Sequence, residues 1–386
     1  MPGEGGRAAT TPRRLSCKAI PKNMPAFAVG ELEQYVIAVF EAAGSSALEA
    51  RIVGQHLIDA NLAGHDSHGV LRIPQYLRAV QSGEVRPNAK PKMVSESNST
   101  ALLDGRSGFG QVIAKESMAV AIRKARACGI SAVTFCNSYH SGRIASYTKM
   151  AAAAGLIGIV MVNAGGGGQS VAPFGGLGRR LATNPLSIAA PSGEGHAIVL
   201  DIATSVAPEG KIREHFQKGQ PIPQGWIIDS QGRPSTNPKD FYDSPGALLP
   251  LGGSAGYKGF GLAFMIDILA GALSGAGCCR VDAFEAKDGL LMIIIDVKRF
   301  SPLETFYKHV ALLVEHVKSC PPALGYEAVF VPGEVEFNEE KKRRREGIVL
   351  HERTWNEIKE AAISVGVTTS PAEKTSDRSF SAEEVT

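Results

Sequence analysis

Apolar residues recur at helical spacing near both ends of the chain. Between residues 28 and 62, two runs place an apolar side chain at every third or fourth position, which predicts two helices. Ser45 and Ser46 separate these runs, and either can cap the second helix. The same spacing predicts further helices at 71–80 and 354–365.

The middle of the chain alternates helical patterns with short apolar runs. Helices are predicted at 111–127, 146–154, 257–273 (long and buried) and 302–317. Strands are predicted at 101–104, 130–135, 157–162, 186–190, 198–202, 290–295 and 329–331. The polar, proline-rich segment 87–99 is typical of a linker or an edge strand. The pattern therefore predicts an α/β (α+β-like) fold, with helices at both ends of the chain around a central sheet.

Composition narrows the class of protein. The chain has 386 residues, of which 44% are hydrophobic and 20% charged, so it can build a core and is not disordered throughout. A net charge of +3 gives no argument for nucleic-acid binding. The sequence contains no uninterrupted run of roughly 18 apolar residues, so it predicts no membrane-spanning helix. We expect neither a nucleic acid nor a membrane as a partner.

The chain ends and the cysteines indicate which parts are disordered and in which compartment the protein resides. Residues 1–25 and 368–386 are polar and predict a disordered arm and a disordered tail. No apolar signal segment is present at the start. The six cysteines are irregularly spaced, with no C-x-x-C pair and no Cys/His ligand spacing. We therefore expect no metal site and no disulfide framework, and a reducing, cytoplasmic location.

The common nucleotide-binding fingerprints are missing. No G-x-G-x-x-G opens a helix after a strand, and the glycine-rich segments 165–168 and 256–261 lack the spacing of a phosphate-binding loop. Taken alone, each glycine-rich segment is more typical of a turn than of a phosphate site.

The densest polar cluster lies at 64–69, with the sequence GHDSHG. A histidine such as His68 exchanges protons near neutral pH. Arg72 follows four residues later, so on a continuing helix both side chains would share a face, and the Arg72 guanidinium could bind a substrate carboxylate. A surface helix cap that uses Asp66 or Ser67 explains the cluster equally well.

Further polar clusters follow predicted strands. The segment 137–142, with the sequence NSYHSG, comes after the strand at 130–135 and contains His140. Similar clusters lie at 183–185 and 201–205. The ends of strands are where open sheets place their ligands, although capping turns use the same residue types. Lys258 lies among glycines near a predicted helix start, which suits a phosphate.

Taken together and in this order, the clusters resemble the type-2 malate/L-lactate dehydrogenase family. The resemblance spans about residues 28–367. Its motifs are GHDSHGVLRIPQY from Gly64, NSYHSG from Asn137, PFGG from Pro173, TNPLSIAAP from Thr183, DIATS from Asp201, GWIIDSQGRPSTNP from Gly225, LLPLGGSAGYKGFGLA from Leu248 and VPGE from Val331.

The resemblance implies a fold and an activity. Family members bind NAD or NADP in a non-Rossmann domain on a largely antiparallel sheet, and they form homodimers or larger assemblies. We therefore expect a helical domain from 26–100 with 335–367, and a cofactor- and substrate-binding domain at 101–334. The expected reaction moves a hydride between the nicotinamide and a small 2-hydroxy acid or 2-oxo acid.

The resemblance also assigns roles to residues. His68, beside Ser67, matches the proton donor and acceptor, and His140 matches a second histidine that serves as the base in some members. The sequence leaves the choice between the two histidines open. Arg72, from charge, and Tyr76 are expected to contact the substrate. The expected cofactor contacts are Thr183, Asn184, Pro185, Asp201, Ile202, Ala203, Thr204, Ser205, Lys258, Gly333 and Glu334.

Two departures from the family pattern leave other functions open. The segment 277–289 is short, and Pro208 and Glu209 interrupt a stretch that is usually continuous. The alternatives are a catalytically degenerate homologue that acts as a dimeric scaffold, or a cyclic imino-acid reductase.

Overall fold

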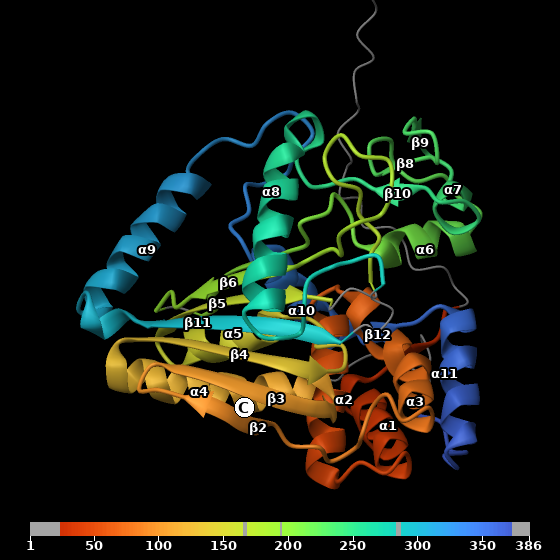
Figure 1. The fold of residues 1–386 in the computed structure, drawn as a ribbon, viewed down its shortest axis with the longest axis horizontal. Helices are drawn as coiled ribbons and strands as arrows, with labels where there is room; N and C mark the ends of the chain where they lie inside the picture. Colours follow the sequence, from red (N-terminus) through yellow and green to blue (C-terminus); the bar gives the residue numbers. More distant parts are fainter. Residues whose placement is uncertain (1–23, 165–167, 194, 283–286, 373–386) are drawn as a thin grey trace, which may run out of the picture.

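A seven-stranded sheet forms the centre of the protein (Figure 1). The computed structural model describes residues 24–164, 168–193, 195–282 and 287–372. In spatial order the strands are β2 (Lys92–Glu96), β3 (Thr100–Gly108), β4 (Ile130–Ser138), β11 (Asp288–Asp296), β5 (Leu156–Asn163), β6 (Leu186–Ala190) and β7 (Ile198–Ile202). Neighbouring strands run antiparallel except β3 and β4, which run parallel. The sheet is therefore largely antiparallel.

The central position of β11 in the sheet explains why residues 290–295 form a continuous apolar run. Leu291 pairs with Thr134 of β4 on one side and with Met161 of β5 on the other. Leu290 and Leu291 face opposite sides of the sheet, and both are buried. A strand that is covered on both faces carries apolar residues without alternation.

Helices cover both faces of this sheet (Figure 1). On one face α4 (Gly110–Cys128) and α5 (Ala145–Ala153) enclose a core that includes Met118 and Met292. On the other face α8 (Tyr257–Ile266) continues into a π-helical turn at Asp267–Ala272 and packs against β5 and β11.

A second, helical core joins the beginning and the end of the described chain. It is built from β1 (Ala26–Phe27), α1 (Val29–Ala42), α2 (Ala47–Leu62), α3 (Ile73–Gln81), β12 (Ile348–Val349) and α11 (Glu352–Ser364). The Phe27 and Trp355 ring centroids are 4.5 Å apart, which packs the two chain ends together. Ser46 caps α2, because its hydroxyl accepts a hydrogen bond from the Glu49 amide.

The remaining elements lie between and around these two cores. A small sheet with the order β10-β8-β9 forms a third cluster with two short helices. Its elements are α6 (Glu209–Gln217), β8 (Ile227–Ile228), β9 (Pro234–Ser235), α7 (Lys239–Tyr242) and β10 (Ala247–Leu248). Helix α10 (Glu334–Glu346) packs against α2, whereas α9 (Leu303–Lys318) has no buried residue.

Most predicted elements are confirmed, within a few residues at their ends. The prediction of a strand at 329–331 is wrong, because this segment is a loop. Next to the loop, the Pro332 carbonyl accepts a single hydrogen bond from the Val199 amide. The helix at 257–273 exists as α8 and its π-helical turn, but it is not buried. Phe264, Met265 and Ile268 are exposed on its outer side.

Some expectations fall outside what the structure describes. The predicted disordered ends lie mostly in residues 1–23 and 373–386, outside the described residues, as do parts of 165–168 and 277–289. Among the described helices, none is both long enough and apolar enough to cross a lipid bilayer.

Candidate active site

Two histidines from distant parts of the sequence lie ring to ring. His68 ends a short 3-10 turn, Asp66–His68, between α2 and α3, and His140 follows β4. Their ring centroids are 5.6 Å apart with an interplanar angle of 21°. Ser67 Oγ lies 3.0 Å from His68 Nδ1. The structure therefore brings together the two predicted acid–base candidates and the predicted serine.

A buried asparagine shapes the segment that carries His68. Asn61 Oδ1 accepts a hydrogen bond from the Val70 amide, and its Nδ2 donates to Asp66 Oδ1. A side chain at Gly69 would collide with this amide, because an added Cβ would lie 2.1 Å from Asn61 Oδ1. Arg343 of α10 pairs with Asp66 and donates to the Asn61 carbonyl. These contacts give the GHDSHG segment one conformation.

His140 is held from behind by a second hydrogen-bond chain. The Tyr76 hydroxyl lies 2.7 Å from His140 Nδ1, and Gln111 Nε2 donates to the same hydroxyl at 2.7 Å. Tyr76 is fully buried and Gln111 is 1% exposed. Since the Tyr76 hydroxyl already has two partners, we place Tyr76 behind His140 rather than against a substrate.

Burial sets the charge state of the site. It lowers the pKa of His140 to about 3, and the positive charge of Arg72 adds to this effect. The pKa of His68 is lowered well below its usual range, chiefly by burial and further by His140 and Arg72. Both imidazoles are therefore neutral at pH 7 before any ligand binds.

Arg72 supplies a positive charge to this neutral pair. Its Nε donates to the Ser67 carbonyl at 2.7 Å, and its Nη1 donates to Gln75 Oε1 at 2.7 Å. Neither partner is a carboxylate, and burial lowers the pKa of the guanidinium. Arg72 is half-buried, and a cation in such a place with only neutral hydrogen-bond partners is well suited to an anionic ligand.

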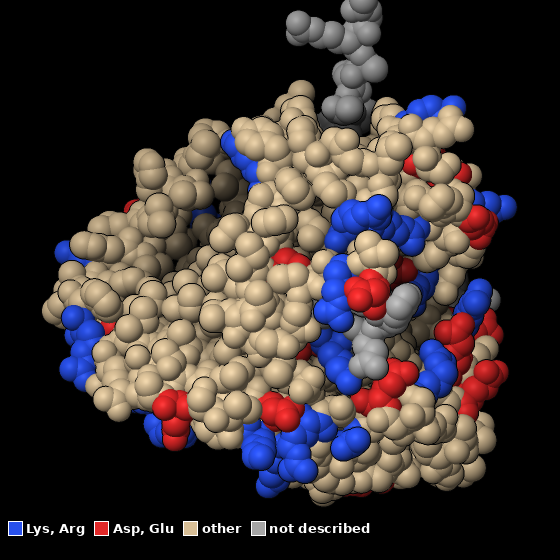
Figure 2. Space-filling view, viewed as in Figure 1, with Lys and Arg blue, Asp and Glu red and all other residues tan. Residues whose placement is uncertain are grey.

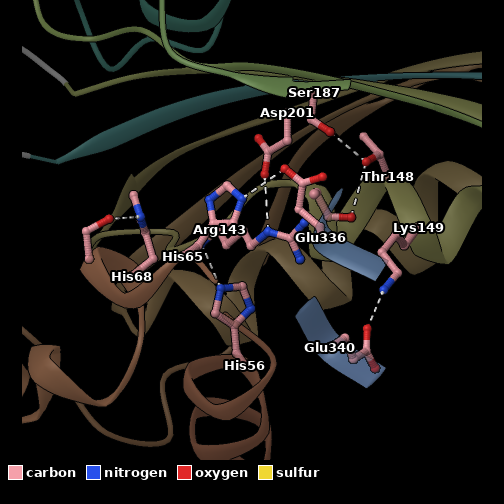
Figure 3. Close-up of polar contacts among 12 residues, drawn as sticks. His56, His65, His68, Arg143, Thr148, Lys149, Ser187, Asp201, Glu336 and Glu340 are labelled. Atoms are coloured by element: carbon pink, nitrogen blue, oxygen red, sulfur yellow. Dashed lines mark hydrogen bonds and ion pairs between the residues drawn. The ribbon is translucent and has the colours of Figure 1, made fainter. Parts of the chain in front are cut away.

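The loop after β4 links the histidine pair to β7. Ser141 N donates to Asp288 Oδ2 at 2.7 Å, and Arg143 N donates to His56 Nε2 at 2.9 Å. The Arg143 side chain then pairs with Asp201 of β7, with Nε and Oδ2 3.4 Å apart and both side chains buried (Figure 3). Burial raises the pKa of Asp288 to about 7. It also raises the pKa of Asp201, against the opposing effect of Arg143.

The predicted cofactor segments 183–185 and 201–205 lie side by side at one end of β7. Thr204 Oγ1 donates to the carbonyls of Thr183 and Asn184. Asn184 Nδ2 donates to the Ala263 carbonyl, which ties this segment to α8. Ser205 forms a bridge with Pro250. The second half of α8 is thereby held next to segment 183–185, and Pro250, which precedes the helix, is held next to segment 201–205.

Lys258 lies in the first turn of α8 and is exposed. Its Nζ is 5.9 Å from the centroid of the Tyr257 ring. None of the contacts described for the histidine cluster involves Lys258.

The predicted Gly333–Glu334 turn lies at the other end of β7. Gly333 is left-handed (φ 88°), and an added Cβ would press against Val199. Glu334 pairs with Lys318 and accepts a hydrogen bond from the Val331 amide, so it stabilises its own turn. A pocket of about 410 Å3 opens here. Its lining includes Arg143, Lys149, His196, Gly333, Glu336 and Phe337.

Sequence reasoning missed several residues that build the site, among them His56, Gln111, Arg143 and Asp288. Each acts through a partner far away in the sequence. The one available signal was the presence of polar residues inside otherwise apolar elements, such as Gln111 at the start of a helix and Asp288 before an apolar strand.

The fold and site define the class of protein: a mixed α/β protein in which a mostly antiparallel sheet and a helical core together bring two neutral histidines and a half-buried arginine into one site. A family model described as malate/L-lactate dehydrogenase matches residues 27–359. The chain belongs to this family.

Individual relatives agree with this assignment. The chain is 38% identical to a malate dehydrogenase of Pyrococcus abyssi over 345 residues, covering 87% of this chain and 94% of the relative. It is 39% identical to hydroxycarboxylate dehydrogenase B of Escherichia coli over 342 residues, covering 87% and 93%. The crystal structure of malate dehydrogenase from Entamoeba histolytica superposes with a TM-score of 0.85 at 31% identity, covering 89% of this chain and 99% of that one.

Proposed function

We propose that this protein is an NAD- or NADP-dependent oxidoreductase that moves a hydride between the nicotinamide and a small 2-hydroxy acid or 2-oxo acid. One observation carries the proposal: the neutral His68–His140 pair lies close to Arg72, a half-buried guanidinium whose two hydrogen-bond partners are neutral, in a chain of this family. The relatives named above are dehydrogenases of malate and of hydroxycarboxylates. Their names favour this function over a scaffold or an imine reductase.

The residues of the site divide the work of hydroxy-acid oxidation. The bound nicotinamide supplies the hydride acceptor. Arg72 binds the substrate carboxylate, most strongly as a bidentate pair, and so orients the carbon that bears the hydroxyl. A neutral imidazole takes the hydroxyl proton as the hydride leaves, and the same imidazole in its protonated form returns that proton in the reverse reaction.

The residues along β7 are suited to a dinucleotide. The pocket of about 410 Å3 beside Gly333 is large enough for part of a nucleotide. Asp201, held by Arg143, offers a carboxylate to ribose hydroxyls, and Lys258 offers a charge to phosphate. Between the Gly333 pocket and Lys258, the segments 183–185 and 201–205 offer backbone and hydroxyl groups that can form hydrogen bonds with the dinucleotide. We propose that this cofactor domain spans 101–334 and is non-Rossmann, and the largely antiparallel order of its sheet supports this.

We also propose that the protein is a homodimer, with a helical domain at 26–100 and 335–367. The outer side of α8 exposes several large apolar side chains, and α9 buries none of its residues. The surface over these helices carries few charged groups (Figure 2). An apolar face of this kind is typical of a subunit interface. The five free cysteines of the described chain suit a reducing compartment, consistent with a cytoplasmic location.

A substrate screen tests the function. Purified protein is mixed with NADH or NADPH and a panel of 2-oxo acids, and cofactor oxidation is followed at the nicotinamide absorbance band. We expect turnover with at least one 2-oxo acid. A thermal-shift titration with each cofactor runs in parallel, because a ligand that binds only the folded state raises its melting temperature. Stabilisation by neither cofactor, together with no turnover, would contradict the proposal and favour the scaffold.

A further inference from the structure

A buried three-residue chain ends on His140 and controls where its proton lies. Gln111 Nε2 donates to the Tyr76 hydroxyl, and this hydroxyl lies 2.7 Å from His140 Nδ1. A hydroxyl has one proton to donate. Because the Gln111 amide occupies an acceptor lone pair of the Tyr76 oxygen, the Tyr76 proton is free to point at His140 Nδ1.

The orientation of the Gln111 amide follows from burial. Its Oε1 is buried and makes no hydrogen bond within the described residues. The reversed amide would instead place the NH2 group, with its two N–H donors, at this position without partners. Buried N–H donors without partners are rarer in proteins than under-satisfied carbonyl oxygens. The orientation in which Gln111 donates to Tyr76 is therefore the more stable one.

Burial also prevents the chain from changing its protonation. Desolvation raises the pKa of the Tyr76 hydroxyl, so the phenol keeps its proton. Desolvation lowers the pKa of His140 to about 3, so the ring is neutral and carries a single N–H. Since Nδ1 accepts from Tyr76, that N–H lies on Nε2.

We propose that Gln111 and Tyr76 are positioning residues that hold neutral His140 as the Nε2–H tautomer, so that His140 donates a hydrogen bond to the substrate oxygen and leaves proton exchange to His68. This inference rests on the proposed function. It resolves which histidine is the base, because an Nε2 that already bears a proton cannot accept another in the neutral ring.

The proton balance of hydroxy-acid oxidation agrees with this division. The O–H bond of the substrate breaks and its proton moves to His68, while the hydride leaves the adjacent carbon for the cofactor. Ser67 Oγ, 3.0 Å from His68 Nδ1, can accept the Nδ1 proton, which leaves His68 Nε2 as the free base. His140 keeps its proton throughout and stabilises the negative charge that develops on the substrate oxygen.

Nitrogen NMR of the imidazole rings tests the tautomer directly, without any substrate. Protein labelled with 15N in histidine is recorded as wild type, as Tyr76→Phe and as Tyr139→Phe, and His140→Asn identifies the His140 signals. Tyr139→Phe is the matched control. Its ring is 5.7 Å from the Tyr76 ring, but its hydroxyl bonds to Gln75.

In the wild type and in Tyr139→Phe we expect a proton-free Nδ1 and a protonated Nε2 on His140. In Tyr76→Phe we expect a mixture of tautomers and a kcat lower by roughly 10- to 100-fold, with a smaller change in KM, as for loss of an orienting hydrogen bond. A protonated Nδ1 in the wild type would overturn the proposal, as would an unchanged His140 spectrum in Tyr76→Phe. If the expected tautomer is found but no 2-oxo acid is reduced, the tautomer assignment stands and the proposed function fails.

Discussion

The imidazole rings of His68 and His140 stack with their centroids 5.6 Å apart, although one belongs to the turn between α2 and α3 and the other to the loop after β4. The first comes from the helical core and the second from the edge of the sheet core. The site therefore exists only when these two cores are packed together. Its acid–base chemistry depends on the same burial that keeps both rings neutral.

Acid should destabilise the protein through its buried histidines. The pKa values of His56 and His140 are lowered to about 3 in the folded state, whereas a histidine in the unfolded chain takes up a proton near its ordinary value of 6.5. The stability that these neutral rings contribute is present above pH 6.5 and is lost as the pH falls. Each ring should lower the free energy of unfolding by up to about 1.4 kcal/mol for each pH unit below pH 6.5.

Urea denaturation between pH 7 and pH 5 measures this effect. His140→Asn should lose less stability over this interval than the wild type, because the variant lacks one of the rings that become protonated on unfolding. Equal losses in the wild type and in His140→Asn would contradict the assignment of a neutral, buried ring.

Asp288 should show the opposite dependence. Burial raises the pKa of Asp288 to about 7 from an ordinary value of 3.8. Its contribution to the free energy of unfolding is therefore fully present below pH 3.8 and is lost as the pH rises through 7. Asp288→Asn keeps an oxygen that can accept from the Ser141 amide, but it cannot ionise. Relative to the wild type, the free energy of unfolding of the variant should therefore rise by on the order of 1 kcal/mol per pH unit between pH 4 and pH 7. A stability difference that stays constant across this range would show that the carboxylate is not destabilised by burial.

Arg72 should determine affinity for the substrate carboxylate. Removing a charge-assisted, bidentate contact costs about 1.5–3 kcal/mol, so Arg72→Gln should lower kcat/KM roughly 10- to 100-fold, chiefly through KM. Arg78→Gln is the matched control, because Arg78 lies in α3, which begins directly after Arg72, and is exposed. Equal kcat/KM values for the two variants would remove Arg72 from the substrate site. Melting temperatures of both variants reveal any loss of folding.

Lys258 should contribute to cofactor binding and little to stability, because it is exposed. Loss of one charged contact to a phosphate should raise the Kd for NADH or NADPH about tenfold. Titration calorimetry of Lys258→Gln, with the equally exposed Lys239→Gln as the control, measures this change. Unchanged affinity in Lys258→Gln would place the cofactor phosphates elsewhere.

The sequence predicted local structure well where periodicity and caps determine it. The Ser46 cap and the strands at 186–190 and 198–202 are examples, whereas the two histidines were matched through the family resemblance. It could not show that Tyr76 lies behind His140, because sequence position says nothing about which partner a buried hydroxyl finds. The link from Arg143 to Asp201 was hidden for the same reason. The exposure of the outer side of α8 was also missed, because an apolar composition does not show whether one side of a helix or its whole surface is buried.

The most direct test of the account compares initial rates of 2-oxo acid reduction for the wild type, His68→Asn and His140→Asn with the same reduced cofactor. Loss of an acid–base group lowers turnover about 10²- to 10⁴-fold, and loss of a hydrogen bond to the developing oxyanion lowers it about 10²- to 10³-fold. We predict that both variants bind the cofactor as the wild type does but lose at least about a hundredfold in kcat. Wild-type turnover in both folded variants would contradict a hydride-transfer site built on His68 and His140.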